Sequence, residues 1–179
     1  MNALTVLARI IDAINDRIGR AVAWATVLLV LVQFVVVLLR YVFGLSFIFV
    51  QESLIYIYAS LFMLGAGYTL LHNGHVRVDL FYRTASTRTK AWVNLLGVIL
   101  LLLPTCVAAW VTGWPYVLAS WAVREGSRET AGIQAIYILK TEILVFAVLV
   151  GLQGVAMAIH AARVLLGEEE LSQEEAPRF

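Results

Sequence analysis

Four long stretches without a charged residue dominate this sequence: residues 21–39, 53–71, 91–123 and 143–162. As a helix, each is long enough to cross the hydrocarbon core of a bilayer, which takes about 20 residues. Only 14% of the residues are charged, against about a quarter in a soluble domain. Because lipid offers the backbone no hydrogen-bond partners, the sequence predicts an all-α membrane protein with four transmembrane helices.

The chain divides into three predicted regions. An amphipathic interfacial helix occupies residues 1–20, a four-helix membrane domain residues 21–166, and an acidic disordered tail residues 167–179. The expected spans are about 21–43, 48–72, 91–121 and 136–166. As one helix, the third uncharged stretch would extend about 50 Å, so it either tilts strongly or breaks. Pro104 and Pro115 can each kink it.

The first 20 residues alternate between two helical faces. One face is apolar and carries Leu4, Leu7, Ile11, Ile14 and Ile18. The opposite face carries Thr5, Arg9, Asp12, Asp16 and Arg20. We expect this helix to lie at the lipid surface or against a neighbouring helix.

Composition excludes several functions. The net charge of +1 leaves no electrostatic footprint for nucleic acid. The single cysteine, Cys106, cannot form an intrachain disulfide or by itself a metal site. No zinc-protease, nucleophile-elbow or phosphate-loop motif occurs, so nothing in the chain indicates an enzyme.

Basic residues predict the orientation in the membrane. With a cytoplasmic N-terminus, the inner side holds Arg9, Arg17, Arg20, Arg77, Arg83, Arg88, Lys90, Arg163 and Arg178. The outer side then holds Arg40, Arg124, Arg128 and Lys140. The positive-inside rule therefore favours cytoplasmic N- and C-termini.

Four charged residues are expected at similar depth near the outer interface: Arg40, Glu52, Lys140 and Glu142. Arg40 is expected to pair with Glu52, because an ionisable group within a membrane needs a partner. Lys140 and Glu142 are two positions apart and point to opposite sides, so at least one is expected to face a second polypeptide. The alternative is that these side chains extend to water. In mid-span, Gln33 is expected to find an interhelical partner.

Small residues recur on one face of the last span. They are Ala147, Gly151, Gly154, Ala158 and Ala161, at steps of four, three, four and three. Such a stripe lets helix backbones approach closely, and we expect it to be a packing surface.

The outer loop at residues 122–135 is the largest hydrophilic segment expected on that side. Its charges cancel: Arg124 and Arg128 stand against Glu125 and Glu129. It is either the contact for an extracytoplasmic partner or a solvated connector.

Two motifs carry a family resemblance. RYVFGLSFIFVQES begins at Arg40 and GAGYTLLHNGHVRVDLFYR begins at Gly65. Together they resemble the small membrane subunit of tripartite ATP-independent periplasmic (TRAP) transporters, the DctQ-like family. The matching positions are Arg40, Tyr41, Phe43, Glu52, Gly65, Ala66, Gly74, His75, Val76, Val78 and Asp79. Gln51 departs from the family's usual acidic residue, and Phe49-Val50 replaces its usual tryptophan.

The resemblance implies an accessory role in the bacterial inner membrane. Such a subunit braces a large elevator-type subunit, which holds the substrate and sodium sites. It also helps to dock a periplasmic binding protein that delivers a solute, usually a carboxylate. No cofactor is implied in this chain. Scaffold or interface roles fall to Arg40, Tyr41, Glu52, Lys140 and Glu142, and an ordering role in the inner loop falls to Gly74, His75 and Asp79.

Two histidines leave an alternative open. His72 and His160 are both expected near the inner face, and histidines at matched depth can be axial haem ligands. The alternative function is therefore a haem b-binding membrane anchor of an oxidoreductase complex.

Overall fold

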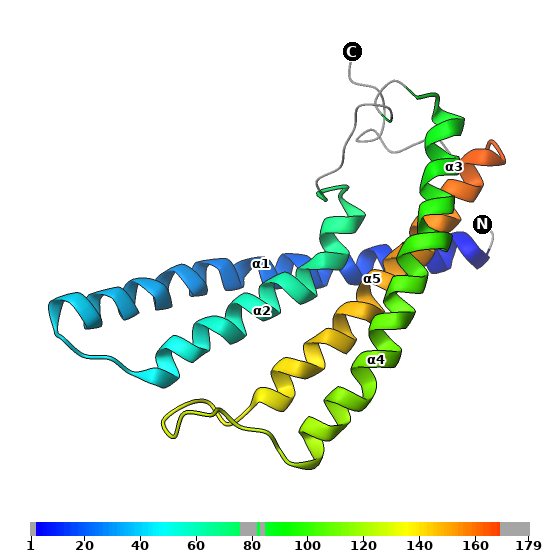
Figure 1. The fold of residues 1–179 in the computed structure, drawn as a ribbon. Coiled ribbons are helices and arrows are strands. Elements are labelled where there is room, and N and C mark those ends of the chain that lie inside the picture. Colours follow the sequence, from blue (N-terminus) through cyan, green and yellow to red (C-terminus); the bar gives the residue numbers. More distant parts are fainter. Residues whose placement is uncertain (1–2, 76–81, 83–84, 169–179) are drawn as a thin grey trace.

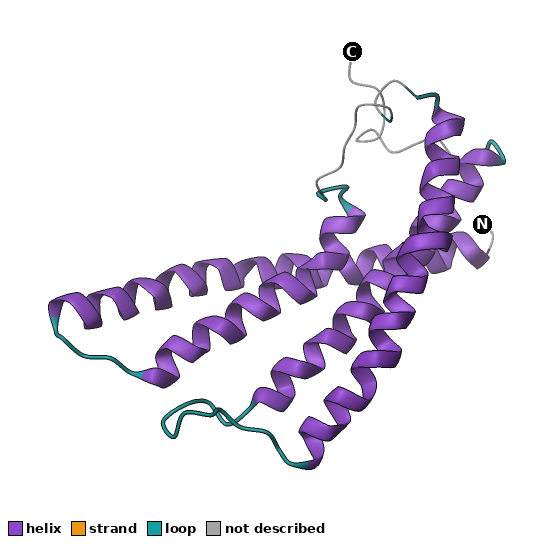
Figure 2. Cartoon of the chain, viewed as in Figure 1, coloured by secondary structure: helices purple, strands orange, loops and turns teal. Residues whose placement is uncertain are grey.

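The computed structural model describes residues 3–75, 82 and 85–168, and helices are the only regular elements in these ranges (Figures 1 and 2). In chain order they are α1 (Ala3–Val42), α2 (Ile48–Leu71), α3 (Thr87–Gly97), the π-helix η1 (Val98–Leu102), α4 (Leu103–Ala122) and α5 (Ile136–Leu165). Since α3, η1 and α4 follow one another without a gap, they form one continuous rod. The four rods are long and apolar enough to cross a membrane, which confirms the predicted fold class.

α5 is the central helix of the bundle, because it packs against α1, α2, α3 and α4. Its small-residue stripe includes the buried residues Ala147, Gly154 and Ala161. A Cβ atom on Gly154 would lie 2.3 Å from Leu102 of η1, closer than real atoms come. The stripe therefore lets the third rod approach α5 closely.

α1 is one unbroken helix of 40 residues, about 60 Å long. The residues expected to form an interfacial helix thus continue directly into the first span. The buried residues of α1 are Thr5, Ala8, Ile11, Asn15 and Gly19. Beyond Gly19 no α1 residue is buried, so the second half of α1 is only loosely covered by the rest of the chain.

A π turn lets the third rod pass Pro104 without breaking. Proline has no N–H, and its ring would collide with the carbonyl four residues earlier, here that of Leu100. The π-helix η1 ends just before Pro104, and the Leu103 N–H donates to the carbonyl of Val98, five residues back. One extra residue is taken up in the wider turn, and the helix then continues into α4.

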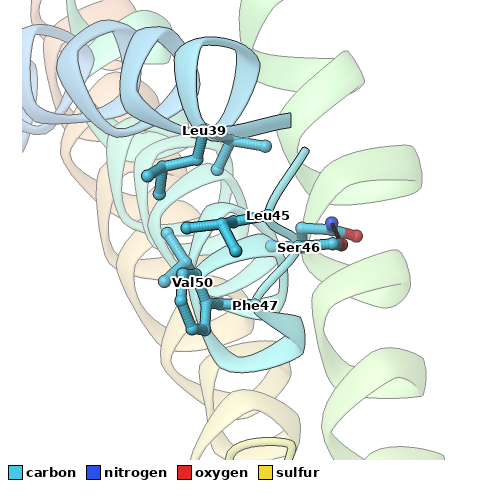
Figure 3. A pocket seen from close by; sticks show the side chains of 7 residues that line it. Leu39, Leu45, Ser46, Phe47 and Val50 are labelled. Atoms are coloured by element: carbon cyan, nitrogen blue, oxygen red, sulfur yellow. Dashed lines mark hydrogen bonds between the residues drawn. The ribbon is translucent and has the colours of Figure 1, made fainter. Parts of the chain in front are cut away.

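The bundle has two distinct ends. The loop end carries the turn at residues 43–47 and the loop at residues 123–135, and the terminal end carries the start of α1, α3 and the end of α5 (Figure 1). At the loop end, Gly44 has a φ of 66°, which suits glycine in a tight turn. The hollow beside this turn measures about 10 Å³ and is lined by Leu39, Leu45, Phe47 and others (Figure 3). It has room for about one water molecule and none for a solute.

Candidate functional site

Glu52 anchors the outer loop instead of pairing with Arg40. Glu52 lies near the start of α2, and its carboxylate accepts hydrogen bonds from Ser127 Oγ at 2.5 Å and from the Ile133 N–H at 2.6 Å. A Cβ atom on Gly132 would lie 2.6 Å from this carboxylate, so the loop backbone comes close here. Among the described residues Arg40 and Glu52 form no ion pair, and that prediction was wrong. The loop folds over the start of α2 and brings backbone and hydroxyl donors to Glu52. The spacing of residues along the chain does not reveal these contacts.

A second anchor joins the loop to α5. Lys140 Nζ donates to Glu125 at 2.5 Å and lies 4.0 Å from the ring centroid of Tyr116. Glu125 also accepts a hydrogen bond from Ser120 at 2.7 Å. The hydrogen bonds from Lys140 and then Ser120 hold the pKa of Glu125 below its usual value of 4.5. Lys140 therefore has its partner within this chain.

Of Lys140 and Glu142, Glu142 is the residue with a carboxylate oxygen that is still available to a partner. One of its oxygens accepts a hydrogen bond from Ser60 of α2 at 2.5 Å. The other oxygen is buried and has no partner in the part of the chain that the structure describes.

The two anchors change the charge that the loop shows to its surroundings. Because Glu52 and Glu125 are engaged internally, the exposed charges of the loop are those of Arg124, Arg128 and Glu129. Charges that cancel in the sequence thus give an exposed loop surface with a net charge of +1. Arg124 also holds the start of the loop in a left-handed turn, with a φ of 46°.

A polar stripe runs along the uncovered side of α1. Thr26, Gln33 and Arg40 are seven residues apart and therefore share one helical face. All three are exposed, as are Val30 and Tyr41 on the same side. No partner for Gln33 is found among the described residues, so its expected interhelical hydrogen bond stays a prediction. We call Thr26, Gln33 and Arg40 the α1 polar stripe.

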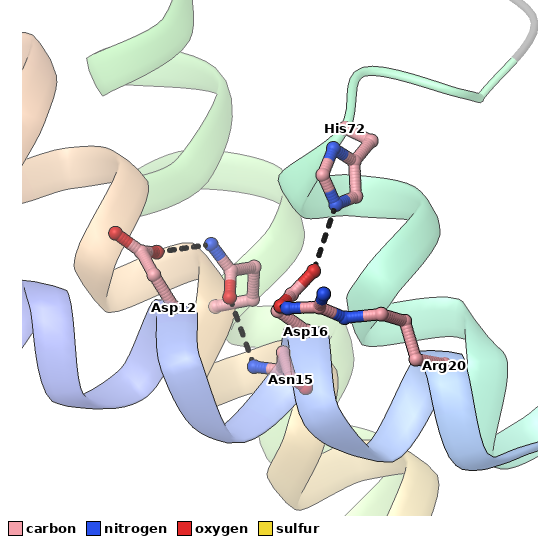
Figure 4. A network of polar contacts seen from close by, with 6 residues as sticks. Asp12, Asn15, Asp16, Arg20 and His72 are labelled. Atoms are coloured by element: carbon pink, nitrogen blue, oxygen red, sulfur yellow. Dashed lines mark hydrogen bonds and ion pairs between the residues drawn. The ribbon is translucent and has the colours of Figure 1, made fainter.

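At the terminal end, a buried polar network ties α1 to α5 (Figure 4). Asn15 Nδ2 donates to Gln153 Oε1 at 2.9 Å, and Gln153 Nε2 donates to Asp12 Oδ1 at 2.8 Å. Asn15 and Gln153 are only 1% and 2% exposed. Sequence reasoning missed this network, although residues 12, 15, 16 and 19 share one polar or small helical face.

The two histidines also contact aspartates of α1. His160 Nε2 lies 3.0 Å from Asp12. His72 Nε2 lies 3.4 Å from Asp16 (Figure 4). Asp16 further pairs with Arg20, one turn along α1. His72 and His160 are thus parts of the packing between α1 and its neighbours.

Only part of the predicted inner-loop motif, which is Gly74, His75 and Asp79, lies within the described residues. The Gly74 N–H donates to the carbonyl of Thr69 at 2.8 Å, just after α2 ends, and Asn73 has a φ of 52°. His75 is exposed, and Asp79 lies outside the described residues. Within the described ranges, no three histidine, cysteine or acidic side chains gather as a metal site.

A comparison with known protein families identifies the kind of protein in which these features occur. The family model for "Tripartite ATP-independent periplasmic transporters, DctQ component" matches residues 29–169, well over half of the chain. The chain belongs to this family. It is therefore a small component of a TRAP transporter, a multi-pass membrane protein and not an enzyme. No curated protein and no solved structure matches the chain.

Membership of the DctQ family sets the haem-anchor alternative aside. A TRAP small component works within a system that also contains a large membrane subunit and a substrate-binding protein. The matched region includes Gln33 and Arg40 of the α1 polar stripe, both loop anchors and Gln153.

Proposed function

We propose that this chain is the small permease subunit of a sodium-coupled TRAP transporter. In this role it braces the large elevator-type subunit and helps to dock the periplasmic binding protein for uptake of an organic carboxylate. Family membership supports the general role. The resemblance of the motifs from Arg40 and from Gly65 supports sodium coupling and the substrate class.

The α1 polar stripe is the observation that carries the bracing role. Gln33 lies near the middle of a membrane span and exposes a side-chain amide among apolar residues. Lipid tails cannot hydrogen-bond an amide, and interhelical hydrogen bonds hold membrane helices together. Arg40, which forms no ion pair with a described residue, adds a charge on the same face near the loop end. Both groups are suited to polar partners on the large subunit.

Removal of the Gln33 amide tests this surface. A hydrogen bond within a membrane is worth about 0.6–2 kcal/mol, so Gln33→Leu should weaken binding of the large subunit about threefold to thirtyfold. Affinity can be measured between the two purified subunits in nanodiscs. Thr112→Val is the control, because the Thr112 hydroxyl of α4 already donates to the carbonyl of Ala108. Unchanged or tighter binding of Gln33→Leu would show that Gln33 faces lipid.

The outer loop is proposed as the contact for the binding protein. Its two anchors hold it against α2 and α5, and its exposed charges sum to +1. A fixed, positively charged surface fits an acidic patch on a soluble partner and raises the rate of encounter.

Charge reversal of the loop tests docking. Arg124→Glu with Arg128→Glu should lower the association rate of the binding protein at low salt, with little change in dissociation. Arg88→Glu on α3, at the opposite end of the bundle, is the control. An association rate equal to that of the unchanged protein would rule out this loop as the docking surface.

The proposed location is the bacterial inner membrane, with both termini in the cytoplasm. The excess of basic residues at the terminal end of the bundle supports this orientation. Labelling of a cysteine introduced at Thr130 by an impermeant reagent in spheroplasts should succeed, and labelling only after lysis would reverse the topology.

Sodium coupling and the substrate class need the complete transporter. Uptake of carboxylates into proteoliposomes should require the large subunit, the binding protein and an inward sodium gradient. Uptake that persists without sodium would contradict the coupling but leave the bracing role standing.

A further inference from the structure

We propose that a groove on the first part of α1 binds the headgroup of an anionic phospholipid in the adjoining leaflet. The groove lies at the terminal end, away from the surfaces assigned to the large subunit and the binding protein. Its function would be to fix the start of α1 at the membrane surface.

The groove is built from one face of α1. It is an open hollow of about 310 Å³, lined by Val6, Arg9, Ile10, Ala13, Ile14 and Arg17. Arg9, Ala13 and Arg17 follow at steps of four, so they stand in line on one helical face. The short alanine side chain leaves a hollow, with an arginine about 6 Å along the axis on each side of it.

The two aspartates of this part of α1 have partners within the bundle. Asp12 and Asp16 turn toward the bundle, where they contact Gln153, His160, His72 and Arg20. Arg9 and Arg17 are exposed and form no ion pair with any residue that the structure describes. Of the described residues, the two arginines are the charged ones that line the groove, and they give it two positive charges. Phosphate oxygens accept hydrogen bonds from such guanidinium groups in a favourable geometry.

The apolar floor indicates a lipid as the source of the phosphate. Ile10 and Ile14 are 51% and 41% exposed, which is costly against water. Since α1 continues without a break into the first span, Arg17 lies about one helical turn from the uncharged stretch that starts at Ala21. Arg9 lies about 18 Å from Ala21 along the helix, so the groove reaches the level of the headgroups with this part of α1 inclined toward the membrane surface. A phospholipid there can satisfy both the arginines and the isoleucines.

Lipid affinity of the purified full chain tests the proposal. Native mass spectrometry can titrate phosphatidylglycerol against phosphatidylcholine on the detergent-solubilised protein. Each arginine near an anionic surface contributes about fivefold in binding, so Arg9→Gln with Arg17→Gln should weaken phosphatidylglycerol binding roughly 25-fold. Arg9→Lys with Arg17→Lys keeps the charge and should retain most of the affinity. Arg88→Gln, an exposed arginine of α3, should bind as the unchanged protein does.

Four results would overturn the proposal. The first is equal affinity of the unchanged protein for the two lipids. The second is full retention of phosphatidylglycerol by the double glutamine variant. The third is loss of the bound lipid when the large subunit is added, which would make the groove a protein interface. Displacement of the lipid by inorganic phosphate alone would likewise contradict a lipid site, because the apolar floor would then contribute nothing.

Discussion

Gln153 connects two helices through a single side chain. It accepts a hydrogen bond from Asn15 and donates one to Asp12, so α5 is joined twice to α1. Its 2% exposure means that water cannot replace these bonds if the amide is lost. A buried polar group left without its partner costs about 1–3 kcal/mol.

Gln153→Leu should therefore destabilise the isolated protein by about 1–3 kcal/mol, because Asn15 and Asp12 both lose a partner. Thermal unfolding of the purified chain in detergent measures this loss. Gln33→Leu is the matched control, since Gln33 is exposed and has no partner among the described residues. If both variants unfold at the same temperature as the unchanged protein, the network does not stabilise the bundle.

For single residues, the sequence predicts which side chains need a hydrogen-bond or ion-pair partner. It predicts less well which residues those partners are. Glu52 and Lys140 both contact the loop at residues 123–135, and the sequence predicts that each of them needs a partner. Their actual partners lie in the outer loop, whose path depends on Gly132 and on backbone donors such as Ile133. The spacing of hydrophobic residues along the sequence does not predict the path of a loop.

Between elements, glycines fix how closely α1 and α2 cross. A Cβ atom on Gly19 would lie 2.2 Å from both Cβ and Cγ of Tyr68. Because Tyr68 Cβ is fixed by its own backbone, a rotamer change cannot relieve this contact. The crossing of α1 and α2 therefore requires glycine at position 19.

Gly19→Ala should force α1 and α2 apart at a cost of about 1–3 kcal/mol, the range for an overpacked contact. Gly65→Ala is the control, since nothing lies within 4 Å of the new methyl group. Alanine also favours a helix over glycine by about 1 kcal/mol, so the control should be equally or more stable. Equal melting temperatures for the two variants would contradict the crossing described here.

Hydropathy predicts the four spans, because the bilayer imposes a length on each. It does not show whether the helix breaks or forms a π turn at Pro104, because the run of apolar residues is the same in both cases. The small-residue stripe of α5 is visible in the sequence, but its partner helix is not. Only the fold shows Gly154 against Leu102 of η1.

Across the whole molecule, the bundle is covered unevenly. α5 is surrounded by the other helices, whereas α1 buries nothing beyond Gly19. Composition cannot predict this difference, because lipid-facing and protein-facing surfaces of a membrane helix are both apolar. The exposed polar residues of α1 show which side is incomplete, and two of them, Gln33 and Arg40, lie within the region matched by the DctQ family.

The central claim is that this side of α1 is completed by the large TRAP subunit. The most direct measurement is photo-crosslinking in native membranes from a photoreactive residue that replaces Gln33, with the same residue at Val111 of α4 for comparison. The account predicts an adduct with the large subunit from position 33. Lipid adducts alone from position 33, in membranes where the transporter is assembled, would contradict it.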